Sequence, residues 1–116
     1  MPRLIKGRRD SAESPSPPDL RIEPDERLEE LAPRLAGAAR IDVHFPKFAD
    51  GRGFTLARLL RSRYGYRGEL RAVGHITRDH LFALAQVGFD AFELREGEDA
   101  AEALAAFEEF SFAYRR

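Results

Sequence analysis

The fold is decided by residues 41–74, IDVHFPKFADGRGFTLARLLRSRYGYRGELRAVG, which we predict to form a strand, a helix and a second strand. Residues 41–45 alternate between apolar and polar side chains, which is typical of a half-buried strand. We expect the helix to begin near Thr55, because leucines recur at helical spacing from there, and to stop at Gly65. Residues 70–74 form the second strand. Parallel strands need such a crossover helix, so this stretch predicts a βαβ unit.

The same alternation continues on both sides of this unit. Residues 20–22 form a short strand before a leucine-patterned helix, and residues 89–94 form a strand after a helix that Thr77 caps. A last helix is expected from residue 98 or 99. The sequence therefore predicts a small α/β domain of βαβ repeats with a mostly parallel four-stranded sheet, either open or half-barrel-like. Both architectures leave sheet edges to be covered, which favours a homodimer.

The first 19 residues differ in composition from the rest of the chain. Residues 2–9 form a basic lead in which Leu4 and Ile5 suit an edge strand. Residues 10–19, DSAESPSPPD, are rich in proline and serine, as in a linker or mobile loop. We therefore interpret residues 1–19 as a basic lead followed by a flexible proline- and serine-rich segment, and residues 20–116 as a single α/β domain.

Composition excludes several classes of protein. The chain has 116 residues, 19 basic and 20 acidic side chains and no cysteine. Without cysteine it cannot form a disulfide or hold zinc or an iron–sulfur cluster through thiolates. It carries no nucleotide, nicotinamide or flavin fingerprint, so we expect no cofactor. A net charge of -1 and the lack of a nucleic-acid motif argue against nucleic acid. No stretch approaches the roughly 20 apolar residues of a membrane span, so we expect a cytoplasmic protein.

Charge is unevenly distributed along the chain. Residues 47–71 contain seven basic and two acidic side chains, whereas residues 89–109 contain eight acidic and one basic. These two segments either attract each other within the fold or offer docking faces to a protein partner.

Ligands of parallel α/β folds bind at the carboxyl ends of the strands, and the loops expected there define a candidate site. In the loop PKFADGRGF, residues 46–54, two glycines flank Arg52 beside a helix start, which suits a bound anion. In the structural alternative, Asp50 caps the helix and Arg52 pairs with an acidic neighbour such as Asp79. The candidate residues for anion binding or another function are Lys47, Asp50, Arg52, His75, Arg78, Asp79 and His80.

The histidines invite a metal interpretation that their spacing does not support. His75, Asp79 and His80 have the residue types of a facial metal triad, but the sequence does not fix all three of them as strong ligands of one metal ion. We therefore expect surface or capping roles for them and no metal. His44 lies beside Phe45 on a predicted strand, and we expect it to be packed or hydrogen-bonded rather than catalytic.

Residues 45–94 resemble a bacterial family, domain-of-unknown-function family 934. The motifs that carry this resemblance are DGRGF at 50–54, ARLLR at 57–61, GELRAVG at 68–74, RD at 78–79 and GFDAFEL at 88–94. Members are labelled as oxidoreductases of sulfite reduction. Many have Asp at position 75 and Gln at position 80, where this chain has His75 and His80.

The resemblance implies a place in sulfite reduction, whereas the residues offer no group that carries electrons. We therefore expect an accessory protein of sulfur assimilation, a non-redox adapter or anion-binding module whose partner is sulfite reductase or another sulfur-assimilation protein. The alternative is an enzyme of unassigned reaction on an anionic small molecule. Arg52 would then clamp the substrate, and Asp50, His75 or Asp79 would act as acid or base. A third interpretation is a dimeric structural protein.

Overall fold

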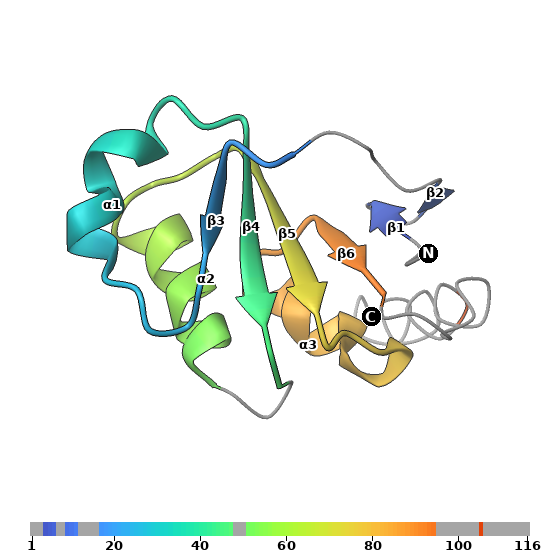
Figure 1. Cartoon of the computed structure of the whole chain (residues 1–116). Helices are drawn as coiled ribbons and strands as arrows, with labels where there is room; N and C mark the ends of the chain where they lie inside the picture. Colours follow the sequence, from blue (N-terminus) through green and yellow to red (C-terminus); the bar gives the residue numbers. More distant parts are fainter. Residues whose placement is uncertain (1–3, 7–8, 12–16, 48–50, 95–104, 106–116) are drawn as a thin grey trace.

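The computed structural model describes residues 4–6, 9–11, 17–47, 51–94 and 105. From residue 20 onward, strands and helices alternate as the sequence predicts (Figure 1). The strands are β1 (Leu4–Lys6), β2 (Arg9–Ser11), β3 (Leu20–Ile22), β4 (Arg40–Phe45), β5 (Glu69–Gly74) and β6 (Ala91–Glu93). The helices are α1 (Leu28–Leu35), α2 (Arg52–Ser62) and α3 (Leu81–Gln86), and the 3₁₀ helix η1 (Arg78–His80) directly precedes α3.

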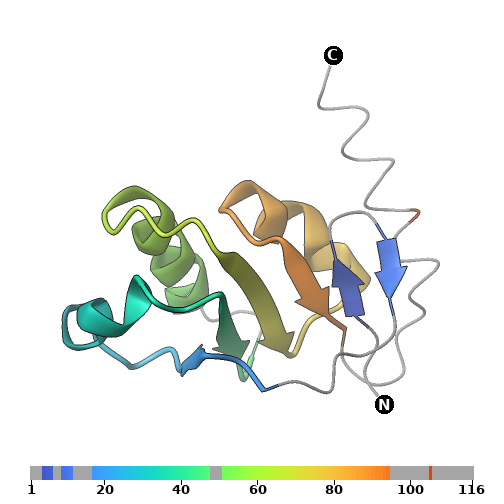
Figure 2. The same cartoon turned by 90° about the horizontal axis from the view of Figure 1, so that it is seen from above.

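The six strands form one sheet in the order β2-β1-β6-β5-β4-β3. Strands β3 to β6 are parallel neighbours in their chain order, which confirms the predicted α/β class and its four parallel strands. The sheet is open, since it ends at β2 and β3 rather than closing as part of a barrel. Because successive crossovers run in one direction, the three α-helices lie on the same side of the sheet (Figure 2).

The lead forms two further strands of this sheet. Leu4 and Ile5 belong to a strand, as the sequence suggested, but β1 lies between β6 and β2 rather than at the edge. Asp10 and Ser11, whose composition suggested a linker, belong to β2. The rest of the proline- and serine-rich segment up to residue 16 lies outside the described residues. So does the last predicted helix, except for Ala105, which is helical.

The face of the sheet that meets the helices is apolar. Side chains alternate along each strand, so Ile41, Val43 and Phe45 share this face of β4, and all three are fully buried. They belong to the same core cluster as Leu60 of α2 and Leu84 of α3. Burial of these side chains is the main driving force for docking the helices on the sheet.

The opposite face of the central strands is charged. On β4, Arg40 donates to Asp42 with 2.9 Å between Nε and Oδ1, and on β5 Arg71 Nη2 lies 2.7 Å from Glu69 Oε2. Asp42 and Arg71 are only 5% and 3% exposed. Charged residues are rarely buried to this extent unless they are paired. This face therefore keeps its charges in opposite-sign pairs.

Helix α2 begins at Arg52, so the prediction of a start near Thr55 was wrong by about one turn. The amide of Thr55 already donates to the carbonyl of Gly51 at 3.2 Å, as inside an α-helix. The reason for the early start is tertiary. A Cβ on Gly53 would collide with the ring of Phe45, so the first turn of α2 packs directly on the end of β4.

None of the helices in the described part of the chain is long and apolar enough to cross a membrane.

Candidate functional site

A hollow of about 540 Å³ lies where β3 and β4 end and α2 begins. It is lined by Pro24, Gly51, Arg52, Thr55 and Leu56, and we refer to it as the carboxyl-edge hollow. Arg52 and Thr55 are exposed, whereas Leu56 is buried beside them. A guanidinium and the amides of a first helical turn thus border one space, and both groups favour an anion. The Thr55 hydroxyl there donates to the Gly51 carbonyl at 3.3 Å.

The other predicted site residues lie at the same edge of the sheet. Lys47 is exposed two residues beyond β4, His75 is exposed directly after β5, and Asp79 is exposed in η1. The amide of His75 donates to the carbonyl of Phe45 at 2.8 Å, which joins the ends of β4 and β5. The pairing of Arg52 with Asp79 stays a prediction.

Two of the predicted roles fall outside what the structure describes. Asp50, the expected helix cap, lies outside the described residues. Arg78 belongs to η1, but its side chain is not among those described.

His80 takes the capping role that the sequence suggested for this cluster. Its Nδ1 lies 3.0 Å from the Thr77 hydroxyl and 3.4 Å from the Thr77 amide nitrogen, at the start of η1. Thr77 therefore begins the helical segment as predicted, although a 3₁₀ turn comes before α3. Among the described residues, no three histidine or acidic side chains come together as a metal site.

A second cluster at this edge joins β3 to β4 on the charged side of the sheet. His44 Nδ1 lies 2.6 Å from Glu23 Oε1, and Arg21 Nε donates to the other carboxylate oxygen at 2.9 Å. Burial raises the pKa of Glu23, but the hydrogen bonds from His44 and Arg21 outweigh it, so the net pKa lies below its usual 4.5. The expectation that His44 is hydrogen-bonded is thus confirmed.

The sequence did not identify Glu23 as the partner of His44, because the two are 21 residues apart. Their contact depends on the parallel register that places Ile22 beside Val43, so that the next residue of each strand points to the same face. The available signal was the position of each polar residue at the carboxyl end of a predicted strand.

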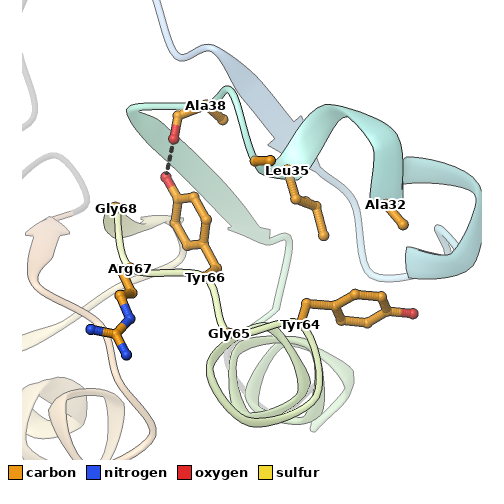
Figure 3. A pocket seen from close by; sticks show the side chains of 9 residues that line it. Ala32, Leu35, Ala38, Tyr64, Gly65, Tyr66, Arg67 and Gly68 are labelled. Atoms are coloured by element: carbon orange, nitrogen blue, oxygen red, sulfur yellow. Dashed lines mark hydrogen bonds between the residues drawn. The ribbon is translucent and has the colours of Figure 1, made fainter.

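The amino edge of the sheet holds a different pocket, of about 360 Å³, which we call the amino-edge pocket (Figure 3). It lies between α1 and the loop after α2, and its lining residues are Ala32, Leu35, Ala36, Ala38, Tyr64, Gly65, Tyr66, Arg67 and Gly68. Figure 3 shows the Tyr66 hydroxyl directed at the Ala38 carbonyl, to which it donates at 2.9 Å. The buried polar group of this pocket is therefore used to hold the backbone.

Arg61 has a similar structural role next to this pocket. Its guanidinium donates to the carbonyls of Tyr66, Gly68 and Gly88 at 2.7–3.1 Å. It also forms an ion pair with Asp90, with 2.7 Å between Nη2 and Oδ2. This pair joins the basic and acidic segments of the sequence within the fold, which supports the first interpretation of their charges.

The model of the family DUF934, described as a bacterial protein of unknown function, matches residues 19–116. The chain therefore belongs to this family, and the predicted resemblance is confirmed. No curated protein and no solved structure matches the chain.

Proposed function

We propose that this chain is a non-redox accessory protein of sulfite reduction that binds a small oxyanion in its carboxyl-edge hollow. The observation that carries the proposal is the exposed guanidinium of Arg52 in a hollow that also contains Thr55 and the start of α2. The link to sulfite reduction comes from the label of the resembling proteins. Sulfite or sulfate is accordingly the first class of anion to test.

The electrostatics of the hollow favour an anion with several oxygen atoms. The amino end of an α-helix carries a partial positive charge, and its first-turn amides point outward. A guanidinium adds a planar fork of donors that matches two oxygen atoms at once. The buried Leu56 makes one wall apolar, which excludes water from that side and strengthens the polar contacts.

An adapter also needs a surface for a protein partner, here sulfite reductase or another sulfur-assimilation protein in the cytoplasm. Lys47 and Arg52 are exposed at the carboxyl edge, so an acidic partner surface would be attracted to these two cations. The outer side of β3 ends the sheet and offers a strand edge, which supports a homodimer.

The alternative function is an enzyme that acts on an anionic small molecule. Of the residues predicted as acid or base, His75 and Asp79 are exposed at the carboxyl edge. The observation that favours an enzyme is instead the contact between His44 and Glu23, because a carboxylate on one ring nitrogen is a common way to prepare a histidine for proton transfer.

Anion titrations of the purified full-length chain test the proposal. Binding of sulfite and of sulfate is measured by calorimetry for the native chain, Arg52→Ala and the control Arg58→Ala, an exposed arginine of the same helix. We expect Arg52→Ala to weaken binding about tenfold or more and Arg58→Ala to change it less than about twofold. Equal losses in both variants, or no binding by the native chain, would contradict the proposal.

Co-purification tests the adapter role separately. The tagged chain is mixed with sulfite reductase at low and high salt, and retention of the reductase is measured. We expect retention at low salt that decreases at high salt, because the attraction is between exposed charges. No retention at either salt concentration would favour the enzyme.

A further inference from the structure

We infer that His44, positioned by Glu23, forms a proton-transfer site for small weak acids at the carboxyl edge, separate from the hollow that contains Arg52. This inference goes beyond anion binding, because it assigns an acid/base group and a different face of the sheet. The ligand class is a small acid whose O–H proton passes to Nε2 of His44, which leaves the acid as an anion beside an imidazolium. The return of that proton reverses the step.

The contacts of Glu23 determine which nitrogen of His44 carries the proton. One oxygen of the carboxylate accepts from Arg21 Nε at 2.9 Å and the other lies 2.6 Å from His44 Nδ1. The lowered pKa keeps Glu23 ionised near neutral pH, and an ionised carboxylate only accepts hydrogen bonds. Nδ1 must therefore be the donor, and in the neutral ring Nε2 has a free lone pair.

The backbone of Gly74 lies beside the Cδ2–Nε2 edge of the His44 ring, where a side chain at residue 74 would collide with the ring. Gly74 has a φ of +103°, and a Cβ placed there would lie 2.8 Å from Cδ2 and 3.1 Å from Nε2 of His44. It would also lie 2.5 Å from the carbonyl oxygen of Phe45. The side chain of His44 is 24% exposed, so part of it meets solvent while its Nδ1 is held by Glu23.

The charged groups around His44 balance in sign. The facing groups are Arg21 and Glu23 from the β3 side, Arg40 and Asp42 on its own strand, and Glu69 and Arg71 on β5. These groups balance in sign, so a neutral His44 leaves this face without net charge. A proton on Nε2 adds one positive charge to this face, which the negative charge of the bound anion balances.

Nitrogen NMR of the isotope-labelled full chain tests the inference. The three histidines give separate ring signals, so His75 and His80 serve as internal controls. We expect neutral His44 to carry its proton on Nδ1, and Glu23→Gln to move that proton to Nε2, because the Gln amide can donate to Nδ1. An Nε2–H ring in the native chain, or an unchanged ring in the variant, would overturn the inference.

Sulfite and sulfate then serve as matched probes at one fixed pH, because bisulfite carries a proton that it can donate in a hydrogen bond to Nε2 near neutral pH and sulfate does not. We expect sulfite to shift the Nε2 signal of His44 through this hydrogen bond and sulfate to leave it unchanged, with His75 as the exposed control. A sulfite response that is equal in His44 and His75, or absent in both, would overturn the inference. Sulfate binding that is lost in Arg52→Ala would leave the proposed function intact in that case.

Discussion

The two edges of the sheet use their polar side chains differently. At the amino edge, Arg61 and Tyr66 donate to four backbone carbonyls, those of Ala38, Tyr66, Gly68 and Gly88. At the carboxyl edge, Arg52, Lys47 and His75 are exposed beside the carboxyl-edge hollow or after strand ends. Removing a side chain that donates to buried carbonyls lowers the free energy of unfolding substantially, whereas removing an exposed side chain changes it little. The comparison separates groups that hold the fold from groups available to a ligand.

The largest expected effect is that of Arg61→Ala. The variant loses the donors to three backbone carbonyls and the ion pair with Asp90, so the carbonyl oxygens are left without these partners. We expect the free energy of unfolding to fall by about 3 kcal/mol. Urea denaturation followed by circular dichroism measures this loss.

The control for this variant is Arg63→Ala, which removes an exposed arginine at the end of the same helix. It should change the free energy of unfolding by less than about 0.5 kcal/mol. Equal losses in Arg61→Ala and Arg63→Ala would show that charge alone, and not the carbonyl contacts, stabilises the amino edge.

Tyr66→Phe should have a smaller effect at the same edge. The substitution keeps the buried ring but removes the hydroxyl that donates to Ala38, which leaves a partly buried carbonyl without that donor. We expect a loss of about 1 kcal/mol in the free energy of unfolding. Tyr64→Phe, in the same amino-edge pocket, is the matched control and should lower the free energy of unfolding less in the same urea titration. An equal loss in Tyr64→Phe would contradict the role given to the Tyr66 hydroxyl.

Local pattern was enough to predict the four parallel strands, because β4 and β5 repeat apolar residues at period two around a leucine-rich helix. It was not enough for contacts that depend on register or packing. The start of α2 is set by the fit of Gly53 against Phe45, and Glu23 meets His44 only through the pairing of β3 with β4. Of the two added strands, the sequence suggested β1 but not β2, and both are held by their pairing with each other and by the pairing of β1 with β6.

The sequence predicted where the candidate site lies, but not which of the residues there have structural roles instead. The rule that ligands gather at carboxyl ends of parallel strands placed Arg52, Lys47 and His75 at one edge. It could not reveal that His80 is used in capping, because that depends on the 3₁₀ turn after Thr77. Nor could it reveal the role of Arg61, whose partners are carbonyls that every residue possesses.

The pH dependence of stability tests how much the ionised Glu23 contributes to stability at the carboxyl edge. Its pKa in the folded chain is below 4.5, because the hydrogen bonds from His44 and Arg21 outweigh burial. The unfolded chain therefore binds this proton first, so the stabilisation by Glu23 is present above pH 4.5 and is lost as the pH falls through the folded value. The carboxylate is 38% exposed, so solvent screening limits the effect to about 0.5 kcal/mol. Urea titrations of the native chain and Glu23→Gln between pH 3 and 7 should converge on the acid side, and curves that stay parallel would contradict this assignment.

The smallest expected effect on stability belongs to Arg52→Ala, and it is the most informative about function. Arg52 is exposed in the first turn of α2, where a positive side chain opposes the positive end of the helix dipole. Its removal should therefore change the free energy of unfolding by no more than about 0.5 kcal/mol. A thermal melt without added anion measures this, and a second melt with sulfate shows whether ligand stabilisation is lost. If the variant melts as low as Arg61→Ala without anion, Arg52 holds the fold, and the carboxyl edge would resemble the amino edge after all.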